Sequence, residues 1–174
     1  MIHITLLSTM KQLGILIGVF AVVILLAWGG RIASTAPSEP SANSASAQSA
    51  FDFTDTAHDF GSISMKDGPV AYRFSLTNST DHEVSIERIT TSCMCTNAYL
   101  HDDSDKKGPF GMPGHGIIPR VNDAVAVAGS REVEVVFDPT AHGPAGIGPI
   151  ERAVFVEDTE GGTQILTIKA LVTP

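Results

Sequence analysis

Apolar residues recur at every second position in several runs of this chain, and no amphipathic helical stretch follows residue 30. The clearest runs are Val70, Tyr72, Phe74 and Leu76, then Val133, Val135 and Phe137. Because side chains alternate between the two faces of a strand, a period of two indicates half-buried strands. Further runs at 150–156 and 165–172 flank a turn, Glu160-Gly161-Gly162. The pattern predicts an all-β domain of about seven short strands in two packed antiparallel sheets.

The predicted domain spans residues 51–174, long enough to bury one core. We expect Phe74, Leu76, Val135 and Phe137 to face that core, since each lies on the apolar phase of its run. Residues 97–122 break the alternation with Asp, Lys, Gly and Pro. Loops of this length are often functional. This segment is therefore predicted to be an ordered excursion packed over one end of the sandwich.

The N-terminal third of the chain predicts a membrane tether. After a short tail at 1–12, residues 13–30 carry no charge and, as a helix, would span about 27 Å, close to the roughly 30 Å hydrocarbon core. A cleaved signal peptide is the alternative, but Arg31 stands where a cleavage site would be expected. The Ser, Ala and Pro-rich residues 31–50 then form a flexible linker. A single-pass membrane protein with its C-terminal domain outside the cytoplasm is expected.

Charge argues against one class of partner. Residues 39–174 hold all 19 acidic residues and 9 of the 11 basic ones, a net charge of −10. Such a domain is a poor partner for phosphate backbones, so nucleic-acid binding is set aside.

Both cysteines lie in one hexapeptide, residues 91–96, which follows a strand-like run. In an extended segment, Cys93 and Cys95 leave the same face while Met94 points the other way. If Met94 instead occupies a turn, the cysteines come close enough for a disulfide. The pair could bind a soft metal, cycle as redox thiols, or close a small structural ring.

Metal binding would recruit histidines from loops. His115 and His142 both lie among Gly and Pro residues and could join Cys93 and Cys95 as ligands. Thiolates with imidazoles suit copper(I), and two of each also suit zinc. A second spaced Cys pair, which makes zinc signatures strong, is missing. Each histidine could otherwise simply brace a turn.

Redox catalysis is less favoured by the sequence. Catalytic dithiols normally use Cys-x-x-Cys at a helix N-terminus, where the helix dipole activates the thiol. No such helix is indicated, and no Ser-His-Asp order or phosphate-binding glycine loop stands out. The sequence therefore predicts no enzyme.

Four short elements in order resemble the bacterial domain-of-unknown-function 1573 family. They are Asp59-Phe60-Gly61, Phe74-x-Leu76-x-Asn78, Ser92-Cys93-Met94-Cys95-Thr96 and Val136-Phe137-Asp138. The resemblance implies an exported immunoglobulin-like sandwich and no established reaction. Met94 departs from the glycine that the family usually has between the cysteines.

Together these features predict a membrane-anchored, extracytoplasmic immunoglobulin-like module that binds another protein or serves as a scaffold. The alternative is a copper- or zinc-binding or thiol-redox protein that uses Cys93 and Cys95.

Overall fold

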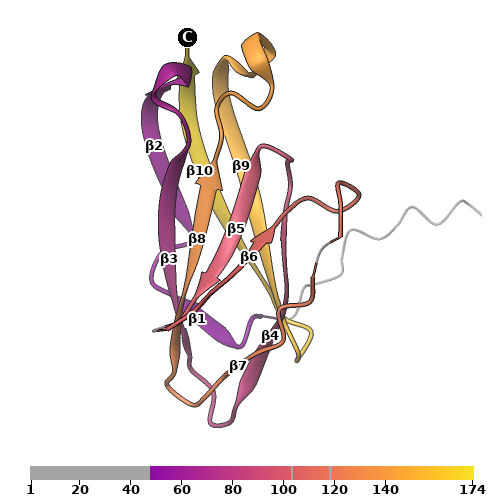
Figure 1. Ribbon diagram of the computed structural model, residues 1–174. Helices are drawn as coiled ribbons and strands as arrows, with labels where there is room; N and C mark the ends of the chain where they lie inside the picture. The colour runs from indigo at the N-terminus through magenta and orange to yellow at the C-terminus, as the bar shows by residue number, and fades with distance from the viewer. Residues whose placement is uncertain (1–47, 103, 118) are drawn as a thin grey trace, which may run out of the picture. The chain divides into compact units, whose positions relative to one another are not determined.

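The computed structural model describes residues 48–102, 104–117 and 119–174, which form two five-stranded sheets (Figure 1). Sheet 1 contains, in spatial order, β1 (Phe51–Phe53), β3 (Val70–Asn78), β8 (Ser130–Phe137), β5 (Thr96–His101) and β6 (Lys106–Phe110). Sheet 2 contains β2 (Ala57–Ser64), β10 (Thr163–Thr173), β9 (Gly148–Asp158), β4 (Val84–Thr91) and β7 (Asp123–Val125). The strand pairs are antiparallel except β2 with β10, which is parallel. The all-β prediction is confirmed, with ten strands in the described chain instead of about seven.

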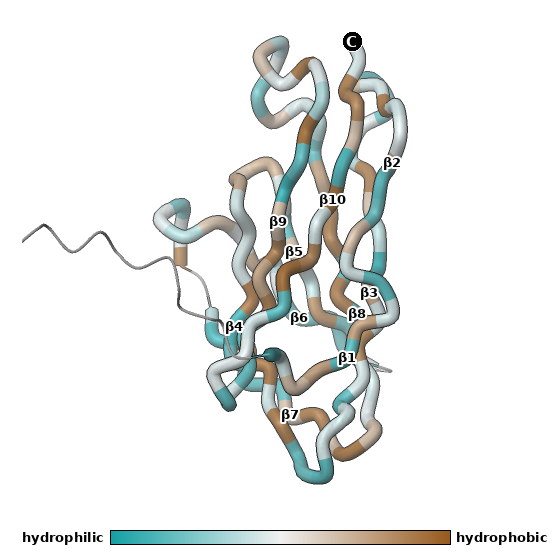
Figure 2. Tube along the Cα trace, turned by 180° about the vertical axis from the view of Figure 1, so that it is seen from behind, coloured by the Kyte–Doolittle hydropathy of each residue, from teal (hydrophilic) through white to brown (hydrophobic). Residues whose placement is uncertain are grey.

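The core follows the alternation of the sequence. The four residues predicted to face the interior, Phe74, Leu76, Val135 and Phe137, are all buried. Figure 2 shows hydrophobic stretches interrupted by hydrophilic residues along β9 and β10. In these strands Val154, Val156, Leu166 and Ile168 point inward and are fully covered. Burial of one face of each sheet therefore accounts for the registers observed.

The prediction that residues 97–122 leave the regular sandwich is wrong for the first half of this segment. Strand β5 occupies its start and pairs with β8, and β6 returns beside β5 to place Phe110 opposite Ala98. Phe110 is buried. The alternation is obscured here because Lys107, Gly108 and Pro109 lie within β6, where strand propensity is low.

The cysteine hexapeptide is a crossover between the sheets. Thr91 ends β4 in sheet 2 and Thr96 begins β5 in sheet 1. The backbone N–H of Thr96 donates to the Cys93 carbonyl at 3.1 Å, which closes a turn over Met94 and Cys95. The turn alternative therefore holds, and the extended one with both sulfurs on one face of a strand is wrong.

A second crossover lies directly beside the first. Residues 138–147, which include the 3-10 helix η2 (Gly143–Gly146), carry the chain from β8 in sheet 1 to β9 in sheet 2. The backbone N–H of Asp138 donates to the Cys95 carbonyl at 2.9 Å. The two crossovers are thus held together by a main-chain hydrogen bond.

A buried carboxylate fixes the point where the described chain enters the sandwich. Asp158, 2% exposed, ends β9 and accepts hydrogen bonds from Ser49 Oγ at 3.1 Å and Ala50 N at 3.0 Å. It also accepts from the backbone N–H groups of Glu160 and Gly162 in the β9–β10 turn. A Cβ at Gly162 would approach Ser49 Cα to 2.7 Å, so only glycine fits there. One side chain therefore organises both a hairpin turn and the start of the domain.

The predicted tail, the predicted anchor at 13–30 and the linker up to residue 47 lie outside the described residues. Among the residues that are described, no helix is long and apolar enough to cross a membrane.

Candidate thiol and metal site

Cys93 and Cys95 are joined by a disulfide across the crossover turn, with their Cα atoms 5.3 Å apart. The backbone N–H of Cys95 donates to Cys93 Sγ at 3.3 Å. Cys95 is 1% exposed, whereas Cys93 is half-buried and the intervening Met94 is 53% exposed. One sulfur is therefore reachable from solvent and the other faces the core.

Neighbouring polar residues hold this turn in place. Thr91 Oγ1 lies 3.0 Å from the carbonyl oxygens of both Cys93 and Thr96, and can donate to either. Ser92 pairs with Ala153 of β9 twice, since its N–H donates to the Ala153 carbonyl and its Oγ accepts from the Ala153 N–H, both at 2.9 Å. The turn is thus fixed to strands of both sheets.

His142 is the predicted histidine that the fold brings to the cysteines. Its Nε2 lies 3.2 Å from Cys93 Sγ, and its ring is exposed. It lies in a tight turn, where the Gly143 N–H donates to the Thr140 carbonyl at 2.8 Å and Gly143 has a φ of +55°. Asp138 Oδ1 accepts from both the N–H and the hydroxyl of Thr140. This turn places the imidazole beside the half-buried sulfur of Cys93.

His115, the other predicted ligand, is not among the residues at the cysteines. It is exposed in the second half of the excursion, where its N–H donates to the Met112 carbonyl at 3.2 Å. In the described chain, the group of neighbouring ligand atoms at the cysteines includes His142 and not His115. The excursion does reach the hexapeptide, since Thr91 N–H donates to the Gly111 carbonyl at 3.1 Å.

Arg152 is a site residue that the sequence analysis missed. Its Nε–H donates to Cys95 Sγ at 3.3 Å from the inward face of β9. A signal was available, because Arg152 stands in phase with Ile150 and Val154, on the side of β9 that faces the core. A guanidinium held against a buried sulfur favours any negative charge that develops there.

The disulfide is a weak staple for the fold. In the chain-entropy model a bridge that closes so short a ring stabilises a protein by roughly 1.5 kcal/mol, about half the value for a 15-residue loop. The polar and ionisable groups around the disulfide are more specifically arranged than a bridge with so small a stabilising effect requires. The two sulfurs and a ring nitrogen of His142 lie within 4.8 Å of one another, an arrangement that reduced cysteines could use to hold a metal ion.

The two packed sheets with a Cys-x-Cys crossover define a β-sandwich protein. A family model described as "Protein of unknown function (DUF1573)" matches residues 51–111, which include the cysteine hexapeptide. The match confirms the resemblance over residues 51–111, which hold three of the four sequence elements, and Val136-Phe137-Asp138 lies outside it.

Solved structures are similar to this chain at low sequence identity. A protein of unknown function from Porphyromonas gingivalis W83 is 12% identical with a TM-score of 0.52, and the match covers 76% of this chain and 51% of that one. The secreted serine protease VesC from Vibrio cholerae is 11% identical, with a TM-score of 0.45 and 71% and 24% covered. The ASH/PapD-like domain 7 of human CEP192 is 12% identical, with a TM-score of 0.44 and 72% and 87% covered.

The chain spans about half the length of the Porphyromonas protein, and that similarity shows the fold alone. No curated protein matches the chain by sequence.

Proposed function

We propose that this chain is a membrane-anchored, extracytoplasmic immunoglobulin-like module that binds another protein through the outer face of sheet 2. The observation that carries the proposal is the contrast between the outer faces of the two sheets. Both faces contain paired charges, but the outer face of sheet 2 also exposes two aliphatic side chains, one of them beside an open groove.

On the outer face of sheet 1, charged side chains form ion pairs with one another. Arg73 pairs with Glu132 at 2.9 Å, and Glu134 pairs with His101 at 2.8 Å and Lys106 at 2.6 Å. The hydrogen bond from Lys106, together with that from His101, lowers the pKa of Glu134 below its ordinary value despite partial burial. This network offers a partner little apolar surface.

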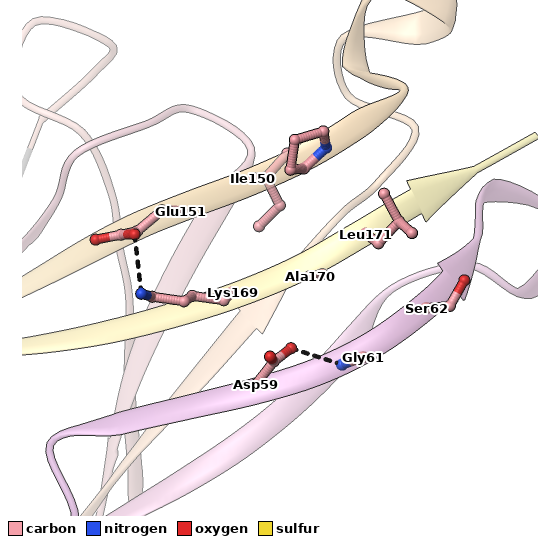
Figure 3. Close-up of a pocket in the computed structure, with 9 residues that line it drawn as sticks. Asp59, Gly61, Ser62, Ile150, Glu151, Lys169, Ala170 and Leu171 are labelled. Atoms are coloured by element: carbon pink, nitrogen blue, oxygen red, sulfur yellow. Dashed lines mark hydrogen bonds and ion pairs between the residues drawn. The ribbon is translucent and has the colours of Figure 1, made fainter.

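The outer face of sheet 2 is different. Ile165 and Leu171 of β10 are 46% and 49% exposed. Leu171 lies on a groove of about 550 Å³ between β2, β10 and β9 (Figure 3). The other lining residues are Asp59, Gly61, Ser62, Pro149, Ile150, Glu151, Lys169 and Ala170. Aliphatic surface rimmed by charges, such as the Glu151–Lys169 pair at 3.2 Å, is typical of protein contact sites.

The sheet edges favour binding through a face over strand addition. The edge strands β1 and β7 have three residues each. On the third edge, β2 has an irregularity around Gly61, and on the fourth, β6 contains Pro109. Short strands, bulges and prolines are the features that discourage pairing with another chain. A partner is therefore expected to lie across the face.

The proposed occupant is a segment of another protein with aliphatic and basic side chains. Residues 48–174 carry 18 acidic and 9 basic residues, so a basic partner is favoured electrostatically. Aliphatic side chains of that segment would cover Leu171 and Ile165, and a basic one would pair with Asp59 or Glu151.

Photo-crosslinking in cells tests this face. A benzoylphenylalanine placed at Leu171 of the full chain is expected to form an adduct, and one at Ser75 on the opposite face is expected to form none. With the crosslinked protein identified and purified, Leu171→Glu should weaken its Kd at least tenfold while Ser75→Glu changes it less than twofold. Equal binding by both variants would refute the proposed face.

The anchor is tested separately. We expect residues 13–30 to remain in the mature protein and hold it in the membrane during alkaline extraction. N-terminal sequencing of the membrane-extracted protein checks this, and a mature chain that starts between Ala33 and Ala50 would contradict it.

A further inference from the structure

We infer that the reduced form of the crossover site binds one copper(I) ion through Cys93, Cys95 and His142, with Arg152 as the compensating charge. This site is independent of the proposed partner-binding face. Its donor atoms already lie within 4.8 Å of one another. Two thiolates and an imidazole are soft or borderline ligands that suit this ion.

The distances require little rearrangement on the histidine side. With bonds of about 2.3 Å to sulfur and 2.0 Å to nitrogen, neighbouring donors around a three-coordinate metal lie about 4 Å apart. Cys93 Sγ and His142 Nε2 are 3.2 Å apart, so a shift of less than about 1 Å opens the required space. The two sulfurs separate only when their bond is broken, which makes reduction a condition for binding.

Charge and coordination number favour copper(I) over zinc. Two thiolates with copper(I) leave one net negative charge, and the Arg152 Nε–H lies 3.3 Å from Cys95 Sγ to balance it. Zinc would instead form a neutral unit beside this cation and would need a fourth ligand. Arg152 has no lone pair to offer, so it cannot supply this fourth ligand.

The disulfide must be reduced before the metal ion can bind. Two molecules of a small thiol reduce the Cys93–Cys95 bond: the S–S bond breaks, two protein thiols form, and the reductant leaves as its own disulfide. Binding of copper(I) then releases the two thiol protons to solvent and forms two metal–sulfur bonds. No electron moves in this second step.

Anaerobic titration of the full chain in detergent tests the site. After thiol reduction and removal of the reductant, copper(I) is added as its acetonitrile complex in competition with bicinchoninate. One ion per chain is expected. Cys93→Ala should abolish this binding, and His142→Ala should weaken it at least tenfold.

His115→Ala is the matched control. His115 and His142 are both exposed loop histidines, so neither substitution removes core contacts, and only His142 lies at the sulfurs. His115→Ala should leave copper(I) affinity within twofold, and zinc(II) titrated against pyridylazoresorcinol should bind less than one equivalent. The inference would be overturned if the two histidine variants bound copper(I) with equal affinity, or if Cys93→Ala bound it as tightly as the unmodified chain. It would also be overturned if zinc bound stoichiometrically and copper(I) did not bind.

Discussion

Replacement of Phe74 by alanine is expected to lower the free energy of unfolding by about 3–5 kcal/mol, because it leaves a cavity in a close-packed core. The Phe74 ring is 0% exposed at the centre of β3, opposite Val133 of β8. Urea unfolding of the full chain in mild detergent, followed by circular dichroism of the β-sheet signal, measures the loss.

Ser75 provides the control for this substitution. It is the next residue of the same strand and points to solvent, so Ser75→Ala should change the unfolding free energy by less than about 0.5 kcal/mol. A loss below about 1 kcal/mol for Phe74→Ala would mean that the two faces of β3 are assigned incorrectly.

Replacement of Asp158 by alanine is expected to cost roughly 2–6 kcal/mol. The backbone N–H groups of Ala50 and Gly162 both donate to this carboxylate in buried surroundings. Each would be left without an acceptor, at roughly 1–3 kcal/mol per group. The same denaturation experiment measures the effect.

Glu83→Ala tests whether loss of a carboxylate alone is responsible. Glu83 is exposed, so its removal should change stability by less than about 0.5 kcal/mol. Equal stabilities of the two variants would show that Asp158 does not hold the start of the domain.

Alternation made the central strands predictable. Both β3 and β8 bury one face and expose the other, so Phe74 and Phe137 could be assigned to the core from spacing alone. Strands β5 and β6 were missed because Gly108 and Pro109 resemble loop sequence, and because β5 pairs on its other side with β8, which is distant in the sequence. Pairing between strands that are distant in the sequence cannot be predicted from a local pattern.

The candidate site was predictable only in part. Local sequence identified Cys93 and Cys95 and gave two equivalent histidines, and the choice between them depends on which loop crosses between the sheets at the same end. Residues 138–147 do so, which brings His142 and not His115 to the sulfurs. Arg152 required knowledge of which face of β9 is covered by the cysteine turn.

The attachment of Ser49 and Ala50 to Asp158 also has a mechanical consequence. Tension on the chain from its N-terminal side would load these hydrogen bonds before it reached β1. Asp158 and Arg152 are six residues apart in β9, a distance of about 20 Å along an extended strand. The attachment that would first take up such a pull is therefore separated from the residue that contacts Cys95 by more than half the length of β9.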